Sequence, residues 1–381
     1  MIKILTVIGA RPQIIKASAL SRVIESHFSG QIEQLLVHTG QHYDENMSNV
    51  FFDELGIPLP DFNLKVGSSS HAVQTAKIME GIEALILSEK PNAILVYGDT
   101  NSTIAAALAA SKLEIPVIHV EAGLRSFNKS MPEEINRILC DHVSTLLFCP
   151  TETAIKNLSK EGFNLAENEK ATIDSPIVFA CGDIMYDNSL HFSEVSAQKS
   201  AVLSENELQA DDFILVTIHR NANTDDQNNL NAIFNALLKV QIESGLDIVL
   251  PLHPRTKKMM ETLLDAELKE KISENKHLKI IPPAGFLDII ALEKNARLII
   301  TDSGGLQKEA FFFHKPCVIL RPETEWVEIV NNGNALLADA DEERIISATF
   351  QLLNKKDFSF PPIFGDGKSA FFIAQKIIEK L

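Results

Sequence analysis

The chain has 381 residues, 45% of them hydrophobic and 23% charged, which is an ordinary globular balance and enough length for two or three domains. Its formal net charge of −16 excludes the basic footprint of a general nucleic-acid binder, although a few fixed cations can still bind an anionic small ligand. No two cysteines have CxxC spacing and no apolar run could span a bilayer, so we expect a cytoplasmic protein with no metal site and no membrane insertion.

The first half of the sequence alternates short apolar runs with longer helical patterns. The predicted strands are residues 2–8, 34–39, 93–97, 116–120 and 145–149. The predicted helices between them are residues 14–26, 71–87, 103–113 and 133–140. Strands with consecutive apolar positions, separated by helices, indicate a parallel sheet that is covered on both faces.

A polar stretch at residues 161–176 interrupts this alternation, and a second set of strands follows it. The predicted strands of this set are residues 178–181, 213–218, 247–251, 278–281, 298–301 and 317–320, with helices at 227–244 and 304–313. We therefore predict an α/β protein with two doubly wound Rossmann-like domains, residues 1–175 and 176–364, that face a cleft. Residues 365–381 form a Gly-Asp-Gly turn and then an amphipathic helix.

In such folds ligands bind at the carboxyl ends of the strands, so the polar residues there are the candidate site. Arg11 and Lys16 follow the first strand and could bind a diphosphate at a helix N-terminus, although a plain turn with solvated charges has the same pattern. Asp99 and Glu121 end two other strands, and Glu133 opens a helix. Asp99 alone could be a helix N-cap and Glu133 a partner of the helix dipole, whereas Glu121 at the mouth of an apolar strand needs a partner or a function. Grouped together, such carboxylates can supply a general acid and a general base.

The second predicted domain carries the complementary groups. His219 and His253 each follow a strand, and a Ser-Gly-Gly turn at 303–305 could bind phosphate at the start of a helix. Glu309 lies less than two turns further on, where it could accept hydrogen bonds from ribose hydroxyls. Together these patterns indicate proton chemistry on a phosphorylated or nucleotide-linked substrate.

The chain contains, in order, the motifs GARPQIIK, GDTNST, HVEAGLR, PEEINR, TIHR, TDSGGLQKEA and GDGKSA. Their order and spacing resemble those of the non-hydrolysing UDP-N-acetylglucosamine 2-epimerases, over nearly the whole chain. The resemblance implies a GT-B-like fold with UDP in the cleft and the helix of residues 365–381 packing back on the first domain. It also implies a homodimeric isomerase, without a cofactor, that interconverts UDP-N-acetylglucosamine and UDP-N-acetylmannosamine for surface polysaccharide synthesis.

The reaction that the resemblance implies avoids a difficult deprotonation, because the hydrogen on carbon 2 is not next to a carbonyl. The family eliminates UDP across carbons 1 and 2 to give a 2-acetamidoglucal. UDP adds back after a proton has been delivered to the other face. This route requires two acid–base carboxylates, a firmly held UDP and exclusion of water.

The family's functional residues can be carried over where the motifs match. The resemblance implies that the catalytic residues are Asp99, Glu121, Glu133 and His219. It implies that UDP or the sugar is bound by Arg11, Lys16, Arg137, His253, Phe286, Ser303, Gly304, Gly305 and Glu309. In some bacterial members the position of His253 belongs to a regulatory second substrate site.

Several positions depart from the common family pattern. Gln13 stands where Glu is usual, Tyr43-Asp44 replace Arg-Glu after Gln41-His42, and Trp326-Val327 replace Arg-Pro. With the sequence CGDIMYD at 181–187, these changes resemble the subgroup that epimerises UDP-2,3-diacetamido-2,3-dideoxyglucuronate. That substrate is the alternative within the family, and a hydrolysing relative, a GT-B glycosyltransferase and a nucleotide-sugar sensor are alternative functions.

Overall fold

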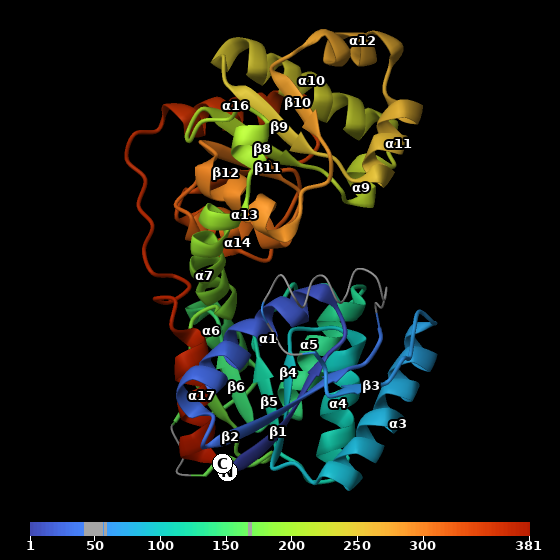
Figure 1. Cartoon of the computed structure of the whole chain (residues 1–381), viewed down its shortest axis with the longest axis vertical. Helices are drawn as coiled ribbons and strands as arrows, with labels where there is room; N and C mark the ends of the chain where they lie inside the picture. Colours follow the sequence, from blue (N-terminus) through green and yellow to red (C-terminus); the bar gives the residue numbers. More distant parts are fainter. Residues whose placement is uncertain (42–55, 57–58, 167–169) are drawn as a thin grey trace. The chain divides into compact units, whose positions relative to one another are not determined.

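The computed structural model describes residues 1–41, 56, 59–166 and 170–381, which form two compact units (Figure 1). Unit 1 comprises Met1–Asn188 and Pro362–Leu381, and unit 2 comprises Ser189–Pro361. Each unit contains one parallel sheet with helices packed on it, so the predicted α/β fold with two Rossmann-like domains is confirmed. No helix in the described ranges is long and apolar enough to cross a membrane. The altered positions Tyr43 and Asp44 lie outside the described residues.

The sheet of unit 1 has seven parallel strands in the order β3-β2-β1-β4-β5-β6-β7. The strands are β1 (Ile2–Ile8), β2 (Ile32–His38), β3 (Phe62–Asn63), β4 (Ala93–Tyr97), β5 (Val117–Val120), β6 (Leu146–Cys149) and β7 (Ile177–Ala180). Every residue of β4, β5 and β6 is buried, as expected for central strands with both faces covered. The strand order reverses between β1 and β4, and this switch point is where doubly wound sheets bind ligands.

The helices of unit 1 are α1 (Arg11–Val23) with the π-helical turn η1 (Ile24–Phe28), α3 (His71–Glu89), α4 (Asn101–Lys112), α5 (Pro132–His142), α6 (Glu152–Lys160), the start of α7 (Ile184–Lys199) and α17 (Ser369–Lys380). Most of these helices bury one face, which on α5 consists of Glu134, Arg137, Cys140 and Asp141, and α4 is buried along most of its length. On α3 the buried residues Ile78, Ile82 and Ile86 are four apart and form one face. The small side chains of α4 allow it to pack against both α3 and α5.

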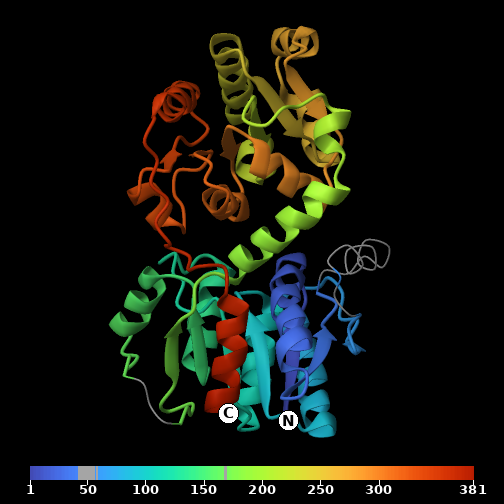
Figure 2. The ribbon, with the colours of Figure 1, turned by 60° about the vertical axis from the view of Figure 1, so that its left-hand side comes forward.

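The C-terminal helix α17 belongs to unit 1 and packs on α1 (Figure 2). The Asp187 carboxylate accepts hydrogen bonds from the backbone N–H groups of Ser369 and Ala370 at the start of this helix, at 3.1 and 2.8 Å. Such a carboxylate also complements the positive end of the helix dipole. The chain just before α17 is held too, because the Asp183 N–H donates to the carbonyl of Phe364.

The sheet of unit 2 has six parallel strands in the order β10-β9-β8-β11-β12-β13. The strands are β8 (Phe213–Thr217), β9 (Asp247–Pro251), β10 (Leu278–Ile281), β11 (Leu298–Thr301), β12 (Cys317–Ile319) and β13 (Ala335–Leu337). The helices are α8 (Val202–Glu205), α9 (Asn221–Thr224), α10 (Gln227–Ser244), α11 (Pro254–Leu263), α12 (Ala266–Glu274), α13 (Phe286–Asn295), α14 (Gly304–Phe312), α15 (Val327–Asn331) and α16 (Glu342–Asn354). Leu230, Phe234 and Leu237 form the buried face of α10, which packs against α16.

The division between the units differs from the boundary expected at residue 176. Strand β7, which was expected to open the second domain, pairs in parallel with β6, with Leu146 opposite Ile177. The chain therefore leaves unit 1 within α7, after Asn188, and returns at Pro362 rather than at residue 365. The described residues of the polar stretch, 161–166 and 170–176, lie between α6 and β7 within unit 1, so they do not separate the two units. The sequence could not show this, because a strand's pairing partner is not encoded in its local pattern.

Gly182 anchors the C-terminal segment and provides a test of this packing. Its φ is +79°, and a Cβ there would lie 2.7 Å from the Phe364 carbonyl oxygen and 2.9 Å from Ser369 Oγ. Gly162 also has a positive φ, +94°, but open space around it, so Gly162→Ala measures the backbone strain alone. We expect Gly162→Ala to lower the free energy of unfolding by about 1–2 kcal/mol. Gly182→Ala should lower it by the same amount and by a further amount of about 1–3 kcal/mol, because the new Cβ is crowded. Urea denaturation followed by circular dichroism measures both, and equal losses would contradict this packing.

Candidate active site

Two of the predicted carboxylates lie at the carboxyl ends of β4 and β5, next to each other in the sheet of unit 1. Glu121 forms an ion pair with Lys16 of α1, and both side chains are largely buried, at 11% and 12% exposure. Glu121 has a φ of +73°, a strained conformation that is typical of functional sites in non-glycine residues. Gly98 leaves room for it, since a Cβ there would lie 3.1 Å from Glu121 Oε2. Asp99 follows Gly98, so the structure brings Asp99, Glu121 and Lys16 together.

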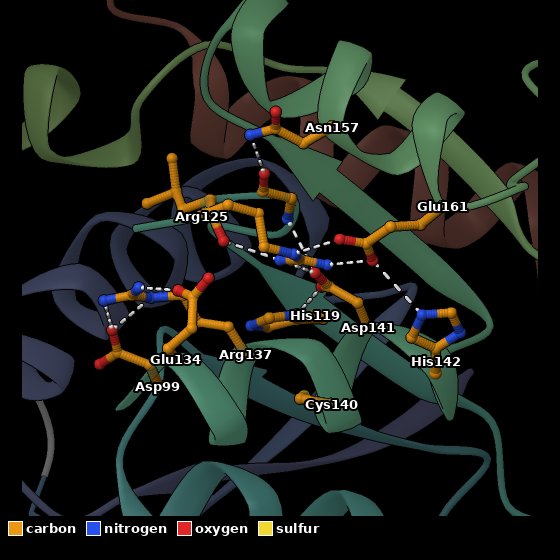
Figure 3. A network of polar contacts seen from close by, with 12 residues as sticks. Asp99, His119, Arg125, Glu134, Arg137, Cys140, Asp141, His142, Asn157 and Glu161 are labelled. Carbon is orange, nitrogen blue, oxygen red and sulfur yellow. Dashed lines mark hydrogen bonds and ion pairs between the residues drawn. The ribbon is translucent and has the colours of Figure 1, made fainter. Parts of the chain in front are cut away.

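Asp99 is held by residues of α5 (Figure 3). Two nitrogens of Arg137 lie 2.8 Å from Asp99 Oδ2, and a third lies 2.6 Å from Glu134 Oε2. The side-chain amide of Asn136 donates to the Asp99 carbonyl at 2.8 Å. Burial raises the pKa of Asp99 above its ordinary value, Glu121 adds to this, and Arg137 opposes it. Such a carboxyl can hold a proton more readily than a solvated aspartate.

Asp99 and Glu133 line one cavity of about 330 Å³ at this edge of the sheet, within the size range of small-molecule sites. Neutral amides form another part of its wall: Gln41, Gln74 and Asn101. The Asn101 amide donates to Gln74 Oε1 at 2.8 Å. The cavity thus combines carboxylates with neutral hydrogen-bonding groups, which suits a polar, uncharged group such as a sugar ring.

The turn after β1 is tied to the turn after β4 by the side chain of Gln13. Its oxygen accepts the N–H groups of Gly9 and Ala10, and its amide nitrogen lies 2.8 Å from the carbonyl of Tyr97. Gly9 is required by this packing, since a Cβ there would lie 2.1 Å from Ser102 Oγ. The unusual residue at position 13 is therefore a buried connector between two strand ends, while the nearby Arg11 is exposed.

In unit 2, His219 and Asp302 follow the neighbouring strands β8 and β11. The buried carboxylate of Asp302 accepts the backbone N–H groups of His219 and Arg220 and the side-chain amide of Asn223, at 3.0 to 3.2 Å. His219 Nδ1 lies 3.1 Å from Asp302 Oδ1, while the histidine ring is 52% exposed. Asp302 was not among the predicted site residues. The sequence could have marked Asp302 by its position between an apolar strand and the Ser-Gly-Gly turn, because a carboxylate buried there needs hydrogen-bond donors or an opposite charge.

The predicted phosphate cradle lies at the start of α14. Ser303 is the N-cap, and its hydroxyl accepts the Leu306 N–H at 3.5 Å. A Cβ on Gly305 would lie 3.8 Å from Ser303 Oγ and 3.9 Å from Glu309 Oε2, so Glu309 turns back toward this helix start. The first turn of a helix offers free N–H groups to an anion, and the structure brings Ser303, Gly304, Gly305 and Glu309 together around it.

Three other residues have mainly packing or capping contacts. Phe286 is buried edge-to-face against Phe192, with ring centroids 5.0 Å apart. His253 is exposed and caps α11 through its ring nitrogen. Trp326 is buried with the Lys308 ammonium 4.1 Å from its ring centroid, in agreement with the packing role that a single buried tryptophan usually has.

A larger cavity of about 580 Å³ lies in unit 1 between the ends of β6 and β7 and the C-terminal segment. It contains none of the predicted site residues. Cys149 and Cys181 line it, but burial raises the pKa of both thiols well above the ordinary value, so neither is an activated nucleophile. Within the described ranges, no three His, Cys, Asp or Glu side chains are placed to hold a metal ion.

Comparison with known proteins identifies the family of this chain. The family model described as UDP-N-acetylglucosamine 2-epimerase matches residues 25–379. The chain belongs to the UDP-N-acetylglucosamine 2-epimerase family. The resemblance drawn from the motifs is confirmed, and the protein is a 2-epimerase with a GT-B-like fold.

Three known proteins illustrate how similar this 2-epimerase is to its relatives. It is 47% identical to a "UDP-N-acetylglucosamine 2-epimerase homolog" of Methanococcus maripaludis, over 100% of this chain and 99% of that protein. It is also 47% identical to the UDP-2,3-diacetamido-2,3-dideoxy-D-glucuronate 2-epimerase of Pseudomonas aeruginosa, over 98% of each chain. The crystal structure of Methanocaldococcus jannaschii UDP-GlcNAc 2-epimerase in complex with UDP-GlcNAc and UDP has 41% identity and a TM-score of 0.82, covering 99% of each chain.

The contacts of Asp302 predict that its side chain contributes to the folding stability of this 2-epimerase, whereas the side chain of His219 contributes little. Asp302→Asn would turn an amide N–H₂ toward groups that are themselves donors, so we expect the free energy of unfolding to fall by about 1–3 kcal/mol. His219→Ala removes a half-exposed ring and should change it by less than about 1 kcal/mol. Urea denaturation of both variants measures this. A loss for His219→Ala as large as that for Asp302→Asn would contradict the assignment.

Proposed function

We propose that this 2-epimerase interconverts UDP-N-acetylglucosamine and UDP-N-acetylmannosamine by eliminating UDP and adding it back. The observation that carries the proposal is the group of carboxylates on neighbouring strand ends, with Asp99 and Glu133 lining one cavity and Glu121 paired with Lys16. The Methanocaldococcus jannaschii relative, whose crystal structure contains UDP-GlcNAc and UDP, adds support. We further propose a cytoplasmic homodimer that needs no cofactor and supplies precursor for surface polysaccharide.

In this proposal Asp99, Glu121 and Glu133 exchange the proton at carbon 2. Their surroundings differ, which supports a division into acid and base: burial raises the pKa of Asp99, whereas Glu121 is paired with a lysine. When two carboxyl groups have different surroundings, one can hold a proton while the other remains ionised. Lys16 would keep Glu121 oriented, and Arg137 would do the same for Asp99.

The proposed UDP-binding groups are also of suitable chemistry. At the start of α14, Ser303 and the two glycines after it offer backbone N–H groups to a phosphate, and Glu309 can accept from ribose hydroxyls. The half-exposed ring of His219, oriented by Asp302, would bind the diphosphate and help UDP to leave. The side chains of Arg11 and His253 are exposed, which suits contact with a ligand. Phe286 would contribute through its packing in unit 2.

A second candidate substrate within the family is UDP-2,3-diacetamido-2,3-dideoxyglucuronate. The specific observation in its favour is the Pseudomonas aeruginosa relative named for that sugar. Its sequence identity to this chain is 47%, the same as that of the Methanococcus maripaludis homolog. The residues Gln13 and Trp326-Val327, which resemble that subgroup, add to it. The chemistry at carbon 2 would be the same for both sugars.

The proposed function is tested by proton exchange with solvent. Incubated in deuterated water with UDP-N-acetylglucosamine and no acceptor, the enzyme should produce UDP-N-acetylmannosamine and place deuterium at carbon 2 of both sugars, as measured by NMR. The same incubation with the diacetamido uronate distinguishes the second candidate, since conversion of that sugar alone would replace the first. Net release of UDP with free sugar would indicate hydrolysis, and no exchange with either sugar would contradict the epimerase proposal.

Replacing the carboxylates tests their proposed roles. Asp99→Asn and Glu121→Gln should each lower kcat by about two orders of magnitude or more, the usual scale for loss of a general acid or base. UDP affinity, measured by calorimetry, should stay within a few-fold of the wild type. Glu83→Gln, an exposed site on α3, is the matched control and should retain full activity. Near-normal rates in both variants would remove these residues from the chemistry.

A further inference from the structure

His119 is a buried histidine on β5, two residues before Glu121, and its ring lies beside Asp141 (Figure 3). Both ring nitrogens of His119 face hydrogen-bond acceptors. Nε2 lies 2.8 Å from the carbonyl oxygen of Gly98, and Nδ1 lies 2.7 Å from Asp141 Oδ1. A carbonyl oxygen can only accept a hydrogen bond, so Nε2 carries a hydrogen. The charge of the ring then depends on whether Asp141 is ionised.

The contacts of Asp141 favour its ionised form. Its second oxygen accepts the backbone N–H of Gly123 at 3.1 Å and lies 2.7 Å from an Arg125 nitrogen. Burial alone would raise the pKa of Asp141, but His119 and Arg125 lower it below the ordinary value. An ionised carboxylate only accepts, so Nδ1 of His119 must donate to it as well. With a hydrogen on both nitrogens, the ring is an imidazolium.

The charges around this imidazolium balance. Arg125 also binds Glu161 through two hydrogen bonds of 2.7 and 2.8 Å. His119 and Arg125 thus supply two positive charges against the negative charges of Asp141, which is buried, and Glu161, which is partly exposed and also lies 3.3 Å from His142 Nε2. Burial would lower the pKa of His119, but neighbouring Cys140 and Asp141 raise it well above its ordinary value.

The group that His119 holds is the turn that carries Asp99. Three successive carbonyl oxygens of this turn accept hydrogen bonds from side chains. The carbonyl of Tyr97 accepts from Thr103 Oγ1 at 2.7 Å. The carbonyl of Gly98 accepts from His119, and the carbonyl of Asp99 accepts from Asn136. Gly98 has a φ of +60° and lacks a side chain to limit its motion. The hydrogen bond from His119 is the contact that fixes the orientation of the peptide between Gly98 and Asp99.

We propose that His119, as a permanent imidazolium, is a positioning residue that locks this peptide and thereby fixes the Asp99 carboxylate relative to Glu121. The inference rests on the proposed function. The link is direct, because Glu121 lies two residues after His119, just beyond the end of β5, and Asp99 directly follows the carbonyl that His119 holds. Reacting groups must be held to within a fraction of an ångström, and a misplacement of 1 Å can cost about a hundred-fold in rate.

Two near-isosteric substitutions separate positioning from a role in stability alone. The amide nitrogen of glutamine reaches the place of Nε2, so His119→Gln keeps the donor to Gly98 and loses the one to Asp141. The amide nitrogen of asparagine takes the place of Nδ1, so His119→Asn keeps the donor to Asp141 and loses the one to Gly98. Each variant loses the positive charge and one hydrogen bond, so they are matched in what they remove.

We expect His119→Asn to lower kcat by roughly ten- to a hundred-fold, with KM and UDP affinity nearly unchanged, while His119→Gln stays within a few-fold of the wild type. Equal kcat losses, or losses that follow the unfolding free energies of the two variants, would overturn the positioning role. Nitrogen-15 NMR of the wild type, with His119→Gln to assign the signal, should show hydrogens on both ring nitrogens near neutral pH. A ring with one hydrogen would overturn the imidazolium, and this readout does not depend on any turnover. Wild-type deuterium exchange, measured first, reports separately on the proposed function.

Discussion

A charge that is removed from water must meet an opposite charge or several hydrogen-bond donors, and this constraint organises the carboxyl ends of both sheets. In unit 1, Lys16 meets Glu121, and Arg137 lies between Asp99 and Glu134. Beneath them, Asp141 lies between two cations. The carboxylates that the proposed reaction would use are therefore held by the same interactions that make their burial possible.

The same constraint explains the backbone at these positions. Glu121 has a left-handed conformation, which costs a non-glycine residue roughly 1–3 kcal/mol. Its side-chain pairing with Lys16 and the two backbone N–H groups at residues 121 and 122, which both donate to the carbonyl of Phe148, offset that cost. Where no charge is available, Gln13 connects the turns after β1 and β4 with neutral hydrogen bonds. The rigidity of the site therefore comes from side chains that hold backbone, as well as from the sheet itself.

The two units place their carboxylates in different surroundings. In unit 1, Asp99 and Glu133 reach a cavity, where a carboxyl group can exchange protons with a ligand. In unit 2, Asp302 is entirely enclosed by donors and leaves the neighbouring ring of His219 half exposed. Such a carboxylate orients other groups and does not itself react.

Local sequence patterns determined much of this protein. The apolar runs of β1, β4 and β9 have the predicted bounds, because buried parallel strands need consecutive apolar residues, and the motif order identified the family. Tertiary structure alone decided that β7 completes the first sheet, that Gln13 joins two turns, and that His119 and Asp302 lie enclosed among charges and donors. The physical reason is that strand pairing, burial and charge compensation arise between segments distant in the sequence, so a residue's local pattern shows that it needs a partner but not which partner it has.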